Sequence, residues 1–353
     1  MKKIRDIHTH WKDPQAPAFV IGEVAQAHDG SLGLAHAYID AIATAGADAV
    51  KFQTHIADEE SSADEPWRVK FSRQDQSRYD YWRRMEFSAD QWAGLKQHAE
   101  EMGLTFISSP FSVAAADLLE RLNMTFWKIA SGEVLNVLLL DFILKTKKPV
   151  LLSSGMSYFR ELDLCVEKVK AGLVPFAVMQ CTTAYPCPAE KIGLNLLADY
   201  HKRYSCPVGL SDHSGTIFPC LAAATQGAKF LEVHVTMSRD MFGPDVPASV
   251  TTAEFAELVR GVRFVEAMLS HPVEKDLAAE TFKPLREMFG QSLVAQNDLA
   301  AGQVIRVTDL TSRKPGRGIP VSKAGEISGR MIRVPVKKGA FLSWDDLENS
   351  TSP

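Results

Sequence analysis

One short stretch of the sequence, residues 127–133, carries side chains that enzymes use for chemistry. It begins with a tryptophan and continues into polar residues, among them Lys128, Gly132 and Glu133. A lysine can hold an anion, a glycine lets the backbone approach that anion, and a glutamate can move a proton. Glu23, which ends an apolar run near the N-terminus, is a second carboxylate for proton transfer. The stretch is typical of a strand end in an α/β protein, where such folds place their active sites.

Two histidines, His213 and His234, each follow an apolar run in the later part of the chain. Imidazoles at neighbouring strand ends can bind one divalent ion and leave coordination positions open for water or substrate. Asp212 and Glu232 lie near them in the sequence as carboxylates that could orient the rings. The plainer alternative is that the two histidines bind no metal and only form hydrogen bonds with polar residues at the strand ends. The anion-binding residues expected nearby favour the metal site.

Several further residues are suited to binding an anion. The pairs 131–132 and 154–155 each combine a serine with a glycine, and so offer a hydroxyl beside exposed backbone N–H groups. Lys51 and Lys128 add positive charge. Together they predict a ligand that carries a phosphate or a carboxylate. Lys128 could instead form a Schiff base with a carbonyl substrate.

The elements that must position these residues follow one repeating pattern. Apolar runs alternate with segments of helical periodicity, and the runs are continuous, as expected of strands buried on both faces. There are eight such runs, at residues 19–23, 48–53, 104–108, 126–129, 149–153, 175–180, 207–211 and 230–235. Eight strand–helix units favour a (β/α)8 TIM barrel over an open sheet. The polar residues after the strands would then converge on one pocket.

The chain is predicted to have two domains. The barrel spans residues 1–270, a linker spans 271–286, and a small β-rich domain spans 287–353, where short β-rich pieces replace helical periodicity. A weak internal repeat aligns residues 302–310 with 339–347 and suggests a compact pseudo-symmetric unit. An insertion at residues 55–87, rich in charged and aromatic residues, is long for a barrel loop. Loops of that length are usually lids or interface pieces.

The overall composition narrows the class of protein. With 46% hydrophobic and 23% charged residues, it is that of an ordinary globular protein. The net charge of -4 gives no reason to expect a nucleic-acid or membrane partner. No apolar run approaches a membrane span of about 20 residues, and the N-terminal residues lack the apolar core of a signal peptide. Five cysteines without CxxC spacing indicate a reduced, cytoplasmic protein.

Short motifs occur along nearly the whole chain, among them 128–133 (KIASGE), 209–213 (GLSDH) and 232–234 (EVH). Through these motifs the chain resembles the sialic acid synthases, a family that includes the legionaminate and pseudaminate synthases. The C-terminal part resembles the family's SAF (antifreeze-like) domain, whose motif ends here in 315–319 (PGRGI). The matching barrel segments are 22–23 (GE), 28–30 (HDG), 45–54 (AGADAVKFQT), 109–111 (SPF), 128–133 (KIASGE), 153–156 (SSGM), 181–186 (CTTAYP), 209–213 (GLSDH), 232–234 (EVH) and 243–245 (GPD). Together they are far more specific than any single motif.

The resemblance implies a reaction and a set of ligands. Phosphoenolpyruvate would condense with an open-chain N-acetylhexosamine, such as N-acetylmannosamine, to give a nine-carbon 2-keto-3-deoxy acid and phosphate. His213 and His234 would bind Mn²⁺, or Mg²⁺ or Co²⁺ in its place, while Glu133, with Glu23, would manage protons. The residues implied for phosphoenolpyruvate are Lys51, Ser109, Lys128, Ser131, Ser154 and Gly155. Those implied for the sugar are Gln53, Tyr185 and Asp245.

The resemblance also implies a homodimer with swapped domains. In the family, a basic residue of the SAF domain reaches the sugar bound by the partner subunit. Here that residue would be Lys314 or Arg313, with Arg317 nearby in the same glycine-rich loop.

Two departures from the family pattern bear on the acceptor sugar. Residues 27–30 read AHDG where the family usually has NHNG, and Thr183 and Ala184 replace a more polar pair. Both changes are expected near the sugar, so the acceptor could instead be a 2,4-diacetamido-6-deoxy sugar or a phosphorylated hexosamine. Two other classes of protein remain open. One is an aldolase that uses Lys128 as its Schiff base, and the other is a non-catalytic sugar-binding barrel.

Overall fold

The computed structural model describes residues 11, 13 and 15–348. The chain forms two compact units, divided between His271 and Pro272. This division lies at the start of the predicted linker. Two short helices, α12 (Lys275–Thr281) and α13 (Lys283–Phe289), occupy most of that linker. None of the described helices is long and apolar enough to cross a lipid bilayer.

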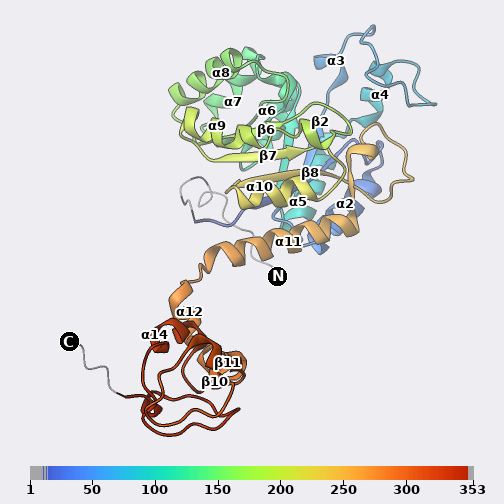
Figure 1. Cartoon of the computed structure of the whole chain (residues 1–353). Coiled ribbons are helices and arrows are strands. Elements are labelled where there is room, and N and C mark those ends of the chain that lie inside the picture. The colour runs from blue at the N-terminus through green and yellow to red at the C-terminus, as the bar shows by residue number, and fades with distance from the viewer. Residues whose placement is uncertain (1–10, 12, 14, 349–353) are drawn as a thin grey trace. The chain divides into compact units, whose positions relative to one another are not determined.

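The first unit is a nearly closed barrel of eight parallel strands (Figure 1). Each strand pairs with its neighbours in the chain and β8 returns to β1, while β3 and β4 lie side by side without a ladder between their described residues. The strands are β1 (Phe19–Ala25), β2 (Ala49–Thr54), β3 (Thr105–Pro110), β4 (Trp127–Ile129), β5 (Val150–Ser153), β6 (Phe176–Cys181), β7 (Val208–Asp212) and β8 (Phe230–Thr236). The short β9 (Val250–Thr251) pairs with β8. The predicted (β/α)8 fold is confirmed.

Helices between the strands cover the outside of the barrel (Figure 1). Several begin where a serine or threonine accepts a backbone hydrogen bond from the first turn, as Ser88 does from Gln91 and Thr251 does from Glu254. The helices are α2 (Leu32–Thr44), α5 (Ala89–Glu101), α6 (Val113–Arg121), α7 (Val137–Lys145), α8 (Phe159–Ala171), α9 (Asn195–Tyr204), α10 (Phe218–Thr225) and α11 (Thr252–Ser270). Their apolar faces and the strands form one continuous core.

The register of the strands brings polar residues to the same level of the barrel. Glu23 on β1 lies opposite Lys51 on β2 and opposite His234 on β8. Ser211 on β7 lies opposite Glu232 on β8. Because neighbouring parallel strands run in register here, side chains that are far apart in the sequence meet near the carboxyl ends of the strands.

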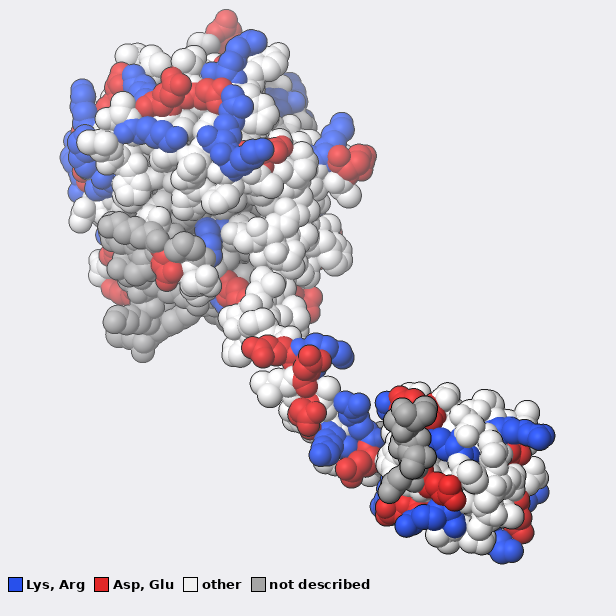
Figure 2. All heavy atoms as spheres, turned by 60° about the vertical axis from the view of Figure 1, so that its left-hand side comes forward, with Lys and Arg blue, Asp and Glu red and all other residues white. Residues whose placement is uncertain are grey.

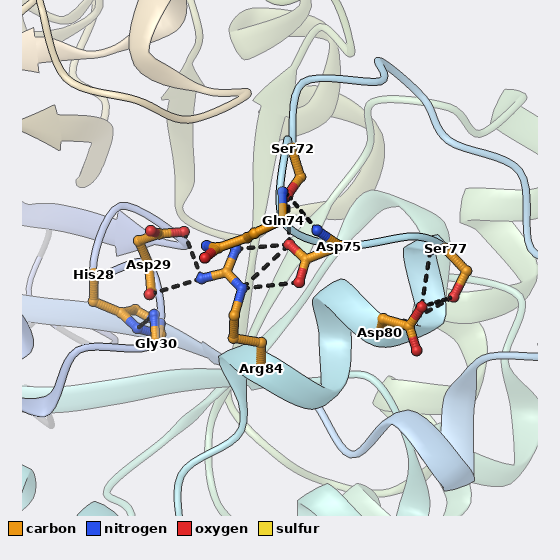
Figure 3. Close-up of polar contacts among 9 residues, drawn as sticks. All are labelled: His28, Asp29, Gly30, Ser72, Gln74, Asp75, Ser77, Asp80 and Arg84. Carbon is orange, nitrogen blue, oxygen red and sulfur yellow. Dashed lines mark hydrogen bonds and ion pairs between the residues drawn. The ribbon is translucent and has the colours of Figure 1, made fainter.

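The insertion after β2 contains two short helices, α3 (Ala57–Glu60) and α4 (Arg78–Met85), which contact each other. Figure 3 shows how its base is fastened to the loop after β1. Arg84 donates hydrogen bonds to the backbone carbonyl of Asp29 at 2.9 Å and to its carboxylate at 2.8 Å. The same guanidinium donates to Asp75 at 2.8–3.2 Å, and Ser72 donates to Asp75 at 2.6 Å. These charge-assisted bonds tie the insertion to the barrel.

A close backbone approach supports the same junction. Gly30 has a φ of +76°, and a Cβ there would lie 2.4 Å from the carbonyl oxygen of Arg84, so only glycine fits. The buried ring of His28 packs on Phe87, at the end of the insertion, with ring centroids 4.8 Å apart. The loop after β1 and the insertion therefore form one packed structure.

The second unit contains a two-stranded antiparallel sheet, β10 (Ser292–Ala295) and β11 (Leu310–Arg313), with a small apolar core and the short helix α14 (Ala324–Ile327). The predicted internal repeat is visible in its backbone. Gly302 and Gly339, which begin the two copies, have φ of +81° and +80°. Each copy then forms a 3₁₀ turn at the same place, Val307–Asp309 and Trp344–Asp346.

Candidate active site

A cavity of about 550 Å³ lies at the carboxyl ends of the barrel strands. Its lining comes from the end of every strand or the loop that follows it, and from the insertion. The predicted site residues that line it are Lys51, Gln53, Ser109, Lys128, Ser131, Glu133, Tyr185, His213, His234 and Asp245. The strand ends therefore converge as expected of a barrel active site.

Three buried charged side chains, Lys51, Lys128 and Glu232, line the floor of the cavity, and Lys51 bonds to a fourth, Glu23, which is buried and does not line it. Lys128 lies between the two oxygens of Glu232, at 2.7 and 2.9 Å. Lys51 bonds to Glu23 and lies 3.5 Å from Glu232. Ser211 donates to Glu232 at 2.9 Å. Glu232 thus holds both lysines at one place, where they could face an anion.

Burial and pairing shift the pKa values of this cluster in opposite directions. Burial would raise the pKa of Glu232, but Lys128 and Lys51 outweigh it and hold that pKa well below its usual range. Burial raises the pKa of Glu23 despite the neighbouring Lys51. For Lys51, burial is outweighed by its two carboxylates and the pKa is raised. The two glutamates therefore favour different protonation states, which suits one to anchor charge and the other to carry a proton.

The two imidazoles predicted to bind a metal lie together at the cavity wall. The ring centroids of His213 and His234 are 5.2 Å apart. Burial, with the charge of His234, lowers the pKa of His213 to about 3, and burial also lowers the pKa of His234. Nδ1 of His213 lies 2.9 Å from the carbonyl oxygen of Thr182, so it carries the hydrogen and Nε2 keeps its lone pair. Neutral imidazoles are what a metal site requires, and the tautomer of His213 leaves its Nε2 free to bind an ion.

The carboxylates expected to orient these rings do not do so. Glu232 is engaged with the lysines, and Asp212 bonds instead to the hydroxyl of Ser214 at 2.6 Å. The nearest carboxylate to His234 is Asp245, 4.0 Å from its Nδ1. No cluster of three or more His, Cys, Asp or Glu suited to one metal ion occurs within the described residues. The donor set thus fits an ion held by two imidazoles, with water or substrate completing its coordination.

Glu133 lies in a 3₁₀ turn (Ser131–Glu133) that directly follows β4. Its carboxylate accepts a hydrogen bond from the side-chain amide of Asn136 at 2.7 Å. Burial nevertheless raises its pKa. A partly buried carboxyl at the edge of a cavity, with a raised pKa, is suited to general acid–base chemistry.

Ser154 and Gly155 do not line this cavity but a second one, of about 230 Å³, and Cys181 lines both. The Ser154 hydroxyl donates to the Met179 carbonyl oxygen at 3.0 Å and accepts from the Tyr200 hydroxyl at 3.0 Å. Its neighbour Ser153 lines the main cavity instead, because successive side chains of an extended chain point to opposite sides. The Gly155 N–H donates to the Ser131 hydroxyl at 3.1 Å, which links the two cavities.

Of the residues expected to hold the sugar, Gln53, Tyr185 and Asp245 line the cavity. Tyr185 packs on His213, with ring centroids 4.2 Å apart. Gln53 accepts from the Gln26 amide at 3.2 Å and lies 3.3 Å from a ring nitrogen of His55. Arg313 and Lys314 belong to the second unit, where Lys314 lies 5.4 Å from the centre of the Phe289 ring.

Most of the residues that depart from the family pattern do not line the cavity. Within the described residues, Ala27 and Asp29 are not part of the cavity lining. Asp29 is bound by Arg84 at the base of the insertion. Thr183 does line the cavity, whereas Ala184 packs against the apolar core. Asp29 therefore contacts the insertion and does not line the cavity.

The cavity also contains residues that sequence reasoning did not assign. The insertion supplies an aromatic and charged wall, with Arg68 placed against two predicted sugar-binding residues. The lining side chains from the insertion are His55, Glu60, Glu65, Trp67, Arg68, Val69, Phe71, Arg78, Tyr81 and Trp82. The unusual composition and length of residues 55–87 indicated a functional segment. They did not indicate which of its residues face the cavity.

Comparisons with known proteins agree with this geometry. The profile of the NeuB family matches residues 38–274, and that of the SAF domain matches 290–348. The human N-acetylneuraminate-9-phosphate synthase is 33% identical, over 96% of this chain and 95% of that protein. An N,N'-diacetyllegionaminic acid synthase from Campylobacter jejuni is 30% identical, over 92% of this chain and 98% of that protein. The crystal structure of an N-acetylneuraminic acid synthetase from Leptospira borgpetersenii superimposes with a TM-score of 0.67 and 28% identity, covering 77% of this chain and 93% of that one. Because the family profile matches more than half of the chain, the chain belongs to the NeuB family of sialic acid synthase-type enzymes and carries a SAF domain.

Proposed function

We propose that the protein condenses phosphoenolpyruvate with the open-chain form of an N-acetylhexosamine to give a nine-carbon 2-keto-3-deoxy acid and phosphate. The observation that carries the proposal is the joint position of two buried lysines and two neutral imidazoles in one cavity. The lysines suit an anionic substrate, and the imidazoles suit an ion beside it. Membership in the NeuB family supports the same reaction class.

In this proposal Lys51 and Lys128 bind phosphoenolpyruvate, with hydroxyls from Ser109 and Ser131. Each ammonium has three N–H donors, so both lysines can donate to the substrate while Glu23 and Glu232 keep them paired. C3 of phosphoenolpyruvate attacks the aldehyde carbon of the sugar, water adds at C2, and phosphate leaves by cleavage of the bond between C2 and its oxygen. The products are the keto acid and inorganic phosphate.

His213 and His234 would hold the divalent ion, for which Mn²⁺ is the first candidate and Mg²⁺ or Co²⁺ the alternatives. When bound, such an ion would supply Lewis-acid polarisation of the aldehyde and activation of the water. The protein's own part is to keep both rings neutral by burial and to fix the His213 tautomer through the Thr182 carbonyl.

Proton transfer falls to Glu133, with Glu23 deeper in the barrel. The aldehyde oxygen needs a proton as the new bond forms, and the attacking water must lose one. Burial raises the pKa of both carboxyls. A carboxyl with a raised pKa keeps its proton closer to neutral pH than an exposed carboxyl does.

One observation favours a second candidate, a Schiff-base aldolase. Burial lowers the pKa of Lys128, and the charge of Glu232 offsets only part of that effect. A lowered pKa makes the neutral amine, the form that attacks a carbonyl, easier to reach. Borohydride with pyruvate would then attach a stable adduct to Lys128, which peptide mass spectrometry detects. The condensation proposed above predicts no adduct.

The acceptor is found by a screen. Purified protein with phosphoenolpyruvate and Mn²⁺ is mixed with N-acetylmannosamine, its 6-phosphate and a 2,4-diacetamido-6-deoxy sugar, and product mass and phosphate are followed. The proposal predicts phosphate release that depends on the acceptor. A folded protein that releases no phosphate with any acceptor, but still binds a sugar, would instead be a non-catalytic barrel.

A further inference from the structure

The insertion at residues 55–87 delivers one arginine into the acceptor end of the cavity. The Arg68 guanidinium lies 2.6 Å from a carboxylate oxygen of Asp245 and 4.4 Å from the centre of the Tyr185 ring. Tyr185 in turn packs on His213. Arg68, Tyr185 and His213 are therefore stacked in that order, and His213 is one of the two imidazoles. Arg68 touches Asp245 and Tyr185, two of the three barrel residues that are expected to hold the sugar.

The insertion holds Arg68 through packing on either side of it. Trp67 and Phe71, the nearest aromatic residues along the chain, are 5.6 Å apart between ring centroids. Both rings pack on Tyr81 of α4, and Phe71 also packs on Phe242. The contacts of Arg84 with Asp29 and Asp75 fasten the base of the same segment (Figure 3). Rigid support of this kind is what makes a recognition residue selective.

The charges that the barrel itself supplies to the cavity favour one class of acceptor. Over the described residues, each lysine and arginine that lines the cavity already faces a carboxylate. Arg68 pairs with Asp245, and Arg78 lies 3.3 Å from Glu65. The floor lysines pair with Glu23 and Glu232. Two further carboxylates of the lining, Glu60 and Glu133, face a histidine and an amide rather than a lysine or arginine.

A phosphate on the acceptor would therefore enter an outer cavity that holds more carboxylates than arginines. Even where it used donors that Asp245 or Glu65 leaves free on its arginine, it would lie beside that carboxylate, which would repel it. An uncharged sugar meets no such cost. Arg68 has five N–H donors, and the donors not used by Asp245 can bond to hydroxyl or N-acetyl oxygens.

We propose that Arg68 determines acceptor specificity and that the acceptor is an uncharged amino sugar rather than a sugar phosphate. This inference rests on the condensation proposed above and adds the class of acceptor to it. Neutralised by Asp245, Arg68 acts as a hydrogen-bond donor to the sugar and not as a phosphate site.

The first test compares acceptors on the full-length enzyme with phosphoenolpyruvate and Mn²⁺. We expect kcat/KM for N-acetylmannosamine, or for a 2,4-diacetamido-6-deoxy sugar, to exceed that for N-acetylmannosamine 6-phosphate by at least about tenfold, the equivalent of about 1.4 kcal/mol. Equal values, or a preference for the 6-phosphate, would overturn the inference and leave the condensation standing. If no acceptor caused phosphate release, the condensation itself would fail, and the acceptor class with it.

The second test examines Arg68 itself. Arg68→Ala should raise KM for the uncharged acceptor about 10- to 100-fold, as expected for the loss of hydrogen bonds from a charged donor, and leave KM for phosphoenolpyruvate nearly unchanged. Arg68→Lys keeps the charge but loses the planar fork, so it should recover only part of the affinity. The matched control is Lys70→Ala, an exposed cation of the same segment. An acceptor KM that Arg68→Ala leaves unchanged would refute the role.

The third test reverses the charge argument. Glu65→Gln removes the partner of Arg78 and frees a cation at the cavity wall. It should improve kcat/KM for the 6-phosphate relative to the uncharged sugar. If selectivity stayed as in the wild type, the charge of the outer cavity would not be what excludes the phosphate.

Discussion

Glu232 is the residue on which the floor of the site depends. A buried carboxylate flanked by two ammonium groups is costly to assemble, and the cost is recovered only because both lysines and Ser211 satisfy its oxygens. The negative charge of Glu232 thereby offsets the repulsion between Lys51 and Lys128 and holds both side chains in one place. The sequence motif at 232–234 drew attention to this glutamate, but as a partner of the histidines. Its actual partners come from β2 and β4, a relation that only the closed barrel creates.

Replacing Glu133 by glutamine should cripple chemistry more than binding. The amide keeps the size and the hydrogen bond from Asn136 but can no longer exchange a proton. General acid–base groups are worth about 10²–10⁴-fold, so kcat should fall by that order while KM for both substrates changes little. Steady-state kinetics measure this directly. A kcat within about threefold of wild type, well under that range, would remove Glu133 from the mechanism.

Activity should require a divalent ion bound by His213 and His234. Chelation with EDTA should abolish turnover and Mn²⁺ should restore it. His213→Ala should lose both activity and bound metal, measured by elemental analysis of the dialysed protein. His271→Ala, an exposed histidine outside the cavity, is the matched control. Full activity of His213→Ala, or indifference to EDTA, would show that the imidazole pair has another purpose.

At the scale of elements, the order of strands and helices was predictable because each strand is a continuous apolar run and many helices begin with a capping residue. The polar residues at the strand ends predicted most of the side chains that line the cavity floor. Two features were not predictable for physical reasons. Which of Ser153 and Ser154 faces the cavity depends on a single step of strand alternation, and Arg68 reaches the site only because the insertion folds back over the barrel mouth.

The junction between the loop after β1 and the insertion should be sensitive to acid. Burial lowers the pKa of His28 from 6.5 to about 3 in the folded protein. Its contribution to stability is therefore full above pH 6.5 and is lost as pH falls from 6.5 towards 3, because the unfolded chain then binds the proton more readily. The loss should be about 2 kcal/mol by pH 5.

Thermal unfolding of the wild type and of His28→Phe at pH 7 and pH 5 would measure this effect. Other buried histidines add to the same trend, so the comparison is between the two pH dependences rather than the absolute melting temperatures. The variant should lose less stability between the two pH values than the wild type. Parallel losses would mean that His28 does not carry a proton-linked part of the stability.

On the scale of the whole molecule, the second unit carries features suited to a partner. Its loop holds the cations Arg313, Lys314 and Arg317. Five apolar side chains of α12, α13 and the residue between them are each 45–68% exposed. They are Leu277, Phe282, Leu285, Met288 and Phe289. On the face of the first unit seen in Figure 2, basic and acidic side chains lie intermixed. Apolar side chains on short exposed helices favour an interface between copies of the chain.

We therefore expect a homodimer in which the SAF domain of one chain serves the barrel of the other. A chain truncated near His271 should keep the barrel and its metal but bind the acceptor sugar poorly. Mixing it with full-length Glu133→Gln should restore some activity, because the truncated barrel keeps Glu133 and the mutant lends its SAF domain. Light scattering reports the assembly. A monomer, or a truncation with unchanged acceptor KM, would contradict the swapped arrangement.

The most direct test of the central claim is the mass of the product formed from phosphoenolpyruvate and an uncharged N-acetylhexosamine, with phosphate followed in the same reaction. The account predicts a product whose mass is the sum of the acceptor and pyruvic acid, formed together with an equal amount of phosphate. Phosphoenolpyruvate that stays intact with every acceptor and divalent metal, in the presence of protein shown to be folded by circular dichroism, would contradict it.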